Sequence, residues 1–220
     1  MAKEREMQER AFPARVEELR ADRGQLPPTR RAPAGTGLVV RGYRDATLLV
    51  ADVLDLPGLA RSAGADRLVA ILDQLFRVAD RAAGNRRLSR VAAAGGFYAV
   101  VGGVPAPRLD HAEAAADLAI EMMQAAARIE APGGQGIAIR VGLHTGPVVA
   151  ALEGRAGVRE VWGESTRIAE RMATQGVPGL VQVSGAAAAR LQGSYRLESR
   201  PGLPGARPLD AWFLMGRRAS

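Results

Sequence analysis

The sequence of 220 residues contains no cysteine and only one lysine, Lys3. The absence of cysteine excludes disulfide bonds and thiolate metal sites, and it is typical of proteins from reducing compartments. Because lysine is nearly absent, almost all of the positive charge comes from arginine. Aromatic residues make up only 4% of the chain, so we expect a core built from alanine, valine, leucine and isoleucine.

A long hydrophobic run is also missing. No stretch of about 18 consecutive apolar residues occurs, so we expect no membrane span. The charged start of the chain lacks the apolar centre of a signal peptide, and we expect a cytoplasmic location. The net charge of +7 raises the alternative of nucleic-acid binding. Acidic residues are interspersed with the arginines, however, and no nucleic-acid-binding motif occurs, so the pattern favours an ordinary solvated surface.

The beginning of the chain differs in composition from the rest. Residues 1–24 alternate acidic residues and arginines along a thin apolar stripe, which allows a weakly amphipathic helix or a disordered tail. Residues 24–37 are rich in proline and glycine and predict a flexible linker. We therefore expect an appendage over residues 1–41 and one folded domain over residues 42–220.

Predicted strands and helices alternate in the folded region. Residues 46–53 form a nearly unbroken apolar run, as in a buried strand. Residues 57–84 have the apolar spacing of a helix, and residues 137–154 are interpreted as strand, turn and strand. The other predicted elements are a hairpin over 89–105, helices over 109–131 and 164–176, a short helix after Ser184, and strands over 179–184, 195–199 and 210–216. This order predicts an α/β sandwich around a mixed sheet.

Five segments resemble the catalytic domain of class III nucleotide cyclases, the adenylate and guanylate cyclases. They are LLVADVLDLPGLA, GGFYAVVGGVPAPRLDHAEAA, RVGLHTGPVVAALEG, VWGESTRIAERM and GVPGLVQVS, and they follow one another in the order of the family over about residues 47–214. The resemblance implies a ferredoxin-like α+β core, with a mixed, mainly antiparallel sheet flanked by helices. It also implies a head-to-tail homodimer with two nucleotide sites at its interface.

The resemblance further implies that each site binds two divalent cations, Mg²⁺ or Mn²⁺, through two aspartates. Such a pair of cations activates an attacking oxygen and neutralises a leaving group. Asp52, at the end of the first apolar strand, matches the first aspartate. Gly96 stands at the second position, and glycine has no side-chain oxygen. Asp55 stands where the family has a small residue, and it is a candidate for a displaced metal ligand.

The loop around Asp52 allows other roles as well. An acid shortly before Pro57 can cap a turn or a helix, which is the structural alternative to metal binding. The backbone N–H groups of Val53, Leu54 and Leu56 are expected to bind phosphate, because successive amides in a turn can hold an anion.

The resemblance also implies a lysine and an aspartate that read the base. Ala92 stands at the position of the lysine, and Arg90, two residues earlier in the same predicted strand, is the cation expected to reach that side. Glu160 stands at the position of the aspartate and keeps its negative charge. The site for the base therefore keeps its acid and loses its lysine.

Ribose and phosphate binding are implied by the helix over residues 164–176. The family has an asparagine and an arginine four residues apart there, which places both on one face of the helix. Arg167 replaces the asparagine, and Arg171 matches the arginine. Arg207, next to Ala206, stands near the position of a phosphate-binding lysine and is expected to replace it.

The replacements at Gly96, Ala92 and Arg167 determine which function we expect. Loss of one preorganised electrostatic group commonly costs about 10²–10³ in rate. We therefore expect a degenerate cyclase domain without a metal cofactor, which acts as a regulatory or nucleotide-binding module. One alternative is a divergent active adenylate or guanylate cyclase that uses Asp52 and Asp55 for Mg²⁺ or Mn²⁺ and Glu160 and Arg90 for the base. Another alternative is a heterodimer with an intact cyclase subunit.

Overall fold

The computed structural model describes residues 30–31, 38–154, 157–204 and 208–219. The expected N-terminal helix and most of the expected linker lie outside the described residues. Two residues of the linker are an exception, because Arg30–Arg31 form the short strand β1, which pairs with β2 (Leu38–Val53). The sheet thus begins ahead of residue 42, where the folded domain was expected to start.

A mixed sheet forms the centre of the fold. Its further strands are β3 (Ser89–Ala94), β4 (Phe97–Gly102), β5 (Ile139–Glu153), β6 (Gly157–Trp162), β7 (Val181–Ser184), β8 (Tyr195–Leu203) and β9 (Leu209–Arg217). Their order is β3-β4-β2-β5-β7-β9-β8, with β1 on β2 and β6 on β5. In the described sheet only β5 and β7 pair in parallel. The prediction of a mixed, mainly antiparallel sheet is confirmed.

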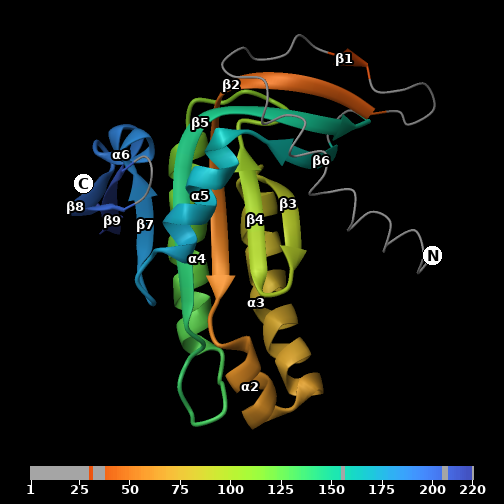
Figure 1. Cartoon of the computed structure of the whole chain (residues 1–220), viewed down its shortest axis with the longest axis vertical. Helices are drawn as coiled ribbons and strands as arrows, with labels where there is room; N and C mark the ends of the chain where they lie inside the picture. Colours follow the sequence, from red (N-terminus) through yellow and green to blue (C-terminus); the bar gives the residue numbers. More distant parts are fainter. Residues whose placement is uncertain (1–29, 32–37, 155–156, 205–207, 220) are drawn as a thin grey trace.

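Helices cover both faces of this sheet. The described helices are α2 (Leu56–Ala63), α3 (Ala65–Asn85), α4 (His111–Arg128), α5 (Glu164–Thr174) and α6 (Gly185–Leu191). In Figure 1, α3 and α4 lie behind the central strands and α5 lies in front of them. None of the described helices is long and apolar enough to cross a lipid bilayer. The helix predicted over residues 57–84 is two helices, since Gly64, with φ +80°, separates α2 from α3.

The segment predicted as strand, turn and strand over residues 137–154 is one continuous strand, β5. Its Pro147 lies opposite an irregularity in β2, where the register shifts between Tyr43 and Ala46. A proline is tolerated at such a bulge because no ladder hydrogen bond is required from its nitrogen. The turn interpretation was wrong for this reason, although the flanking apolar residues were correctly assigned to strands.

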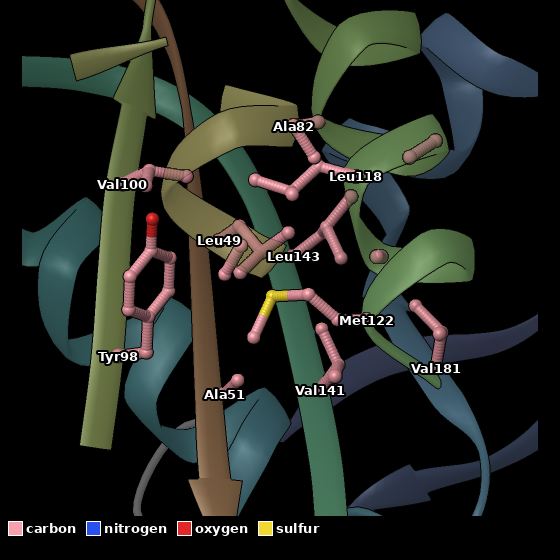
Figure 2. Close-up of a cluster of buried hydrophobic side chains, with 14 of the residues drawn as sticks. Leu49, Ala51, Ala82, Tyr98, Val100, Leu118, Met122, Val141, Leu143 and Val181 are labelled. Carbon is pink, nitrogen blue, oxygen red and sulfur yellow. The ribbon is translucent and has the colours of Figure 1, made fainter. Parts of the chain in front are cut away.

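The main core lies between the sheet and the helices α3 and α4. Figure 2 shows Leu49 and Ala51 of β2, Val141 and Leu143 of β5, and Leu118 and Met122 of α4 in this layer. Aliphatic residues dominate the core, as the composition predicted. The fully buried Tyr98 adds an aromatic contact with Phe76, at 5.4 Å between the ring centroids.

The opposite face of the sheet leads to the candidate site. Side chains alternate along a strand, so Leu48, Val50 and Asp52 share the face that packs against α5. The packing of α5 on β5 is close, because a Cβ atom at Gly142 would lie 2.2 Å from the backbone nitrogen of Ala173. The glycine therefore allows α5 to lie directly on the sheet.

Candidate functional site

Asp52 lies near the end of β2, opposite Arg140 of β5 in the antiparallel register. Its Oδ2 atom accepts a hydrogen bond from Nη2 of Arg140, and the side chains of Asp52 and Arg140 are 11% and 22% exposed. Nη1 of Arg140 donates to the backbone carbonyl of Thr174, the last residue of α5, at 2.5 Å. The carboxylate expected to bind a metal is therefore already neutralised by a largely buried guanidinium.

The helix-capping role that the sequence allowed for Asp52 belongs to Asp55 in the structure. It is the N-cap of α2, with φ +50°, and its Oδ1 accepts a hydrogen bond from the backbone N–H of Gly58 at 3.0 Å. A Cβ atom at residue 58 would lie 1.9 Å from Oδ2 of Asp55, so the glycine makes room for this cap. The carboxylate of Asp55 is thus used at the start of α2, where it complements the positive end of the helix dipole.

Gly96 lies in the hairpin turn between β3 and β4, with φ +84°. A Cβ atom at this position would lie 2.5 Å from Cδ1 of Leu56. The end of the Leu56 side chain therefore lies where the Cβ of a residue 96 side chain would be, and it would have to shift to admit an aspartate. The second metal aspartate is missing from the sequence, and an apolar side chain lies against its position.

The expected phosphate cradle is not open in this structure. The backbone N–H of Val53 donates to the carbonyl of Gly96 at 3.0 Å, and that of Leu54 donates to the carbonyl of Ala138 at 2.9 Å. Both N–H groups are therefore hydrogen-bonded to backbone carbonyls of neighbouring segments. Leu56 is the first residue of α2 and follows the N-cap Asp55. The chain thus stays paired beyond the point where a turn was expected, and phosphate binding by Val53, Leu54 and Leu56 stays a prediction.

These observations test whether the residues present fit a pair of divalent cations. Such cations take several oxygen ligands, most often carboxylates. Asp52 is paired with Arg140, Asp55 caps α2, and Gly96 is covered by Leu56. Within the part of the chain that the structure describes, no three His, Cys, Asp or Glu side chains gather as a metal site would require. The residues present do not fit the two-cation arrangement.

Arg90 does not reach the position of the missing lysine. Its Nη1 binds Oδ2 of Asp80 on α3 at 2.8 Å, and Tyr98 donates to the other oxygen of the same carboxylate at 2.9 Å. The register of β3 shifts between Arg90 and Ala92, so the simple alternation used in the prediction does not hold there. The base-reading role suggested for Arg90 is therefore contradicted by its ion pair on the α3 side.

Glu160 and Ala92 stand on strands that contact each other. Glu160 lies on β6 opposite Ala151 of β5, and β6 also contacts β3, which carries Ala92. Glu160 is half-buried, whereas Ala92 is exposed. The two positions that the resemblance assigned to the base thus lie on contacting strands, with an acid at one and a methyl group at the other.

Arg167 and Arg171 lie one turn apart on α5, as predicted. Arg167 forms an ion pair with Glu164 at 3.1 Å, and both side chains are more than half exposed. Nη2 of Arg171 donates to the backbone carbonyl of Pro204 at 3.1 Å. Pro204 is followed by residues 205–207, so the predicted role of Arg207, beside Ala206, lies outside the described residues.

Two residues of this region were not found from the sequence. Arg140 precedes the segment VGLHTGP, and only the pairing of β2 with β5 reveals that it faces Asp52. Leu56 looks like an ordinary apolar residue at the start of a helix, and only the fold places it over Gly96. Alternation along β5 relative to the apolar run of β2 is the one sequence signal that indicates Arg140.

A buried histidine lies further along β5. The Nδ1 atom of His144 and Oγ of Ser184 are 2.8 Å apart, in hydrogen-bond contact, and Ser184 also caps α6 by accepting from the N–H of Ala187. Burial lowers the pKa of His144 to about 4. The imidazole is therefore neutral at physiological pH and belongs to the polar interior of the fold.

Comparison with known proteins supports the same family over nearly the whole described region. Over 186 residues the chain is 34% identical to a protein named adenylate cyclase from Mycobacterium tuberculosis. The match covers 83% of this chain and 42% of that protein, so the chain spans less than half the length of this relative.

Solved structures share the fold at low sequence identity. The guanylyl cyclase domain of the RhoGC fusion protein from the aquatic fungus Blastocladiella emersonii matches with a TM-score of 0.74 at 21% identity, covering 81% of this chain and 99% of that one. The guanylate cyclase domain of RhGC from Catenaria anguillulae, solved with GTP, matches with a TM-score of 0.73 at 22% identity, over 81% and 100% of the two chains. The model of the adenylate and guanylate cyclase catalytic domain matches residues 38–216, which shows that the chain belongs to that family.

Proposed function

We propose that this domain binds a nucleoside triphosphate or a related phosphorylated ligand without cyclising it at the rate of an active cyclase, and that it acts as a regulatory module. The observation that carries the proposal is the state of Asp52. This carboxylate, the one retained from the expected metal pair, is bound by Arg140, and the place of the other is filled by Leu56.

The cyclisation reaction explains why the pairing of Asp52 matters for the proposed function. Formation of a 3′,5′-cyclic monophosphate requires attack of the ribose 3′-hydroxyl on the α-phosphorus and departure of pyrophosphate. Charge accumulates on the leaving group, and groups fixed in advance must neutralise it. Ala92 and Arg167 also stand in place of the base-reading and ribose-orienting residues that the family resemblance implies. Since these groups act as one unit, their losses do not simply add, but little activity is expected to remain.

Ligand binding requires less than cyclisation. Arg167 and Arg171 lie on one face of α5 and present two guanidinium groups, which can form bidentate contacts with phosphate oxygens. Glu160 adds an acceptor for N–H groups of a base on the strand that contacts β3. The domain thus keeps groups for recognition and lacks those for metal-assisted chemistry.

A dimer is part of this proposal. The Blastocladiella emersonii domain forms a non-canonical dimer in one solved structure and is a monomer in another, and the Catenaria anguillulae domain was solved in complex with GTP. We expect this chain to form a head-to-tail homodimer, and a heterodimer with an intact cyclase subunit is the alternative arrangement. Co-expression with such a subunit, scored by a change in its activity, tests the heterodimer.

Cyclic nucleotide formation is the experiment that decides the proposed function. Purified protein at high concentration is incubated with ATP or GTP and with Mg²⁺ or Mn²⁺, and cyclic AMP and cyclic GMP are quantified. The proposal predicts no product above that of the Asp52→Asn variant. Product that disappears in Asp52→Asn would overturn it. Asp73→Asn, which removes an exposed carboxylate on α3, is the matched control.

A divergent active adenylate or guanylate cyclase is the second candidate function. The comparisons by themselves favour it, because the relatives are named as cyclases and the mycobacterial protein is 34% identical. The residues at the site favour the first proposal, because Asp52 is paired with Arg140 and Asp55 caps α2. The same product assay separates the two candidates.

A further inference from the structure

The last turn of α5 is bound by side chains from two strands of the sheet. Met172 and the C-cap residue Gln175 lie at the end of this helix, where backbone carbonyls lack an amide partner within the helix. Nε2 of Gln182, on β7, donates to the carbonyl of Met172 at 3.1 Å. Nη1 of Arg200, on β8, donates to the carbonyl of Gln175 at 3.4 Å. Side chains of the sheet thus take the place of the missing amides.

Gln182 is fully buried and connects these two contacts. Its neighbours Val181 and Val183 belong to the main core, so Gln182 points to the opposite face of the sheet, where α5 lies. Its Oε1 accepts a hydrogen bond from Nη1 of Arg200. Burial of an amide is costly unless it is hydrogen-bonded, and here both its oxygen and its nitrogen have partners. Arg200, Gln182 and Met172 therefore form one path of contacts from β8 to α5.

Packing holds the side chain of Arg200 beside this helix. Its guanidinium lies over the ring of Phe213 on β9, 5.2 Å from the ring centroid. Ala211, the register partner of Arg200 on β9, belongs to a separate hydrophobic cluster with Met172 of α5 and Leu203 of β8. A planar guanidinium can stack on an aromatic ring and donate in fixed directions at the same time, which a lysine ammonium cannot do.

A hydrogen bond also runs in the opposite direction between the same two segments. Nη2 of Arg171, on α5, donates to the carbonyl of Pro204, which directly follows β8. Arg171 is predicted to bind phosphate, and the chain continues from Pro204 towards Arg207, the other arginine with this predicted role. The side chains of Arg200 and Arg171 thus join α5 to the end of β8 at two points.

We infer that Arg200, together with Gln182, is a positioning residue of the phosphate-binding part of the site: it holds the last turn of α5 against β8 and thereby sets where Arg171 lies. The inference rests on the proposed function, because it takes Arg171 to contact phosphate. It assigns no ligand contact to Arg200 or Gln182.

The test combines nucleotide binding, hydrogen exchange and thermal unfolding of the full chain. Affinity is measured by titration with a fluorescent derivative of ATP and one of GTP, and exchange of the Gln175 and Gly176 amides is followed by NMR. Arg200→Gln is expected to weaken binding about tenfold and to speed exchange of both amides by a similar factor, because the end of α5 is released. Its Tm is expected to fall by about 4 °C.

A double-mutant cycle separates positioning from general destabilisation. In the Arg171→Gln background, Arg200→Gln is expected to cause little further loss of affinity, because it acts through Arg171. Arg196→Gln removes an exposed arginine from the same strand and is expected to leave all three readouts unchanged. Arg200→Lys keeps the charge without the planar fork of donors, and its affinity is expected to lie between those of Arg200→Gln and the wild type. If Arg200→Gln does not fold, the cycle is carried out with Arg200→Lys.

Wild-type affinity in Arg200→Gln would overturn the inference, and so would equal losses of affinity from this change with and without Arg171. Unchanged exchange of the Gln175 and Gly176 amides would overturn it as well. A wild type that binds neither nucleotide would refute the proposed function, and amide exchange would then decide alone whether Arg200 holds α5. Cyclic product from a wild type whose cycle gives the expected result would refute the proposed lack of cyclisation and leave the inference standing.

Discussion

The end of β2 and the exposed face of α5 satisfy their charged groups in opposite ways. At the end of β2, the largely buried Asp52 is bound by Arg140, and the exposed Asp55 caps α2. On α5, Arg167 is more than half exposed and pairs with Glu164 on the same helix. The acid at the end of β2 is therefore paired within the fold, whereas the arginine of α5 stays at the surface.

A substitution at the contact between α5 and the sheet is expected to have the largest effect on the free energy of unfolding. In Gly142→Ala the new Cβ would meet the nitrogen of Ala173 at 2.2 Å and the carbonyl oxygen of Ala169 at 2.6 Å. Backbone atoms of a packed helix cannot move aside singly, so we expect the free energy of unfolding to fall by about 3 kcal/mol. Urea denaturation measures this loss. Gly84→Ala, in open space on α3, is the control and is expected to be neutral or stabilising. An unchanged stability in Gly142→Ala would refute the close packing.

Substitutions at residue 96 test whether Leu56 occupies the space beside the position expected for the second metal aspartate. Gly96→Asp introduces both a positive φ and a contact with Leu56, and we expect it to lower the free energy of unfolding by about 2 kcal/mol. Gly95→Asp, which shares the positive φ but meets nothing within 4 Å, isolates the backbone cost and is expected to lose about 1 kcal/mol. Equal losses in the two variants would show that Leu56 does not fill the site.

The buried imidazole of His144 is expected to make the stability of the protein depend on pH. Its pKa is about 4 in the folded protein and 6.5 when unperturbed, so between these values the unfolded state binds more protons. Stability is therefore expected to rise with pH across this window, by at most about 1.4 kcal/mol per pH unit, and to lose this contribution as the pH falls toward 4. His144→Asn should flatten this slope when unfolding is followed at several pH values. A slope that persists in the variant would assign it to other groups.

The exposed half should show the smallest effect on stability. Arg167→Ala breaks an exposed pair with Glu164 and is expected to change the free energy of unfolding by less than about 0.5 kcal/mol. The same change is expected to weaken binding of a fluorescent nucleoside triphosphate about tenfold, because a guanidinium–phosphate contact is lost. Arg77→Ala, which breaks an exposed pair on α3, is the matched control for both readouts. Unchanged nucleotide affinity in Arg167→Ala would remove α5 from the proposed site.

The sequence predicted the order of elements well, since periodicity reports local structure. It also placed Asp52 at a strand end and Arg167 and Arg171 on one helix face. It failed where two distant segments decide the outcome. A bulge in β3 turns Arg90 toward Asp80, and the continuity of β5 depends on an irregularity in its partner β2.

The pairing at the end of β2 was missed for the same reason. Arg140 lies 88 residues after Asp52 in the sequence, and nothing in its immediate neighbours marks it as a partner of an acid. Leu56 and Gly96 likewise meet only because the hairpin folds over the start of α2. Substitution patterns can show that a ligand is missing, but the fold is needed to show what has taken its space.

The most direct measurement of the central claim is the amount of cyclic AMP and cyclic GMP that the wild-type domain forms beside Asp52→Asn, with Mg²⁺ and with Mn²⁺. A half-site whose acid is held by Arg140 and whose second carboxylate is absent should give equal, background amounts in both proteins. Cyclic product from the wild type that is lost with the Asp52 carboxylate would contradict the account.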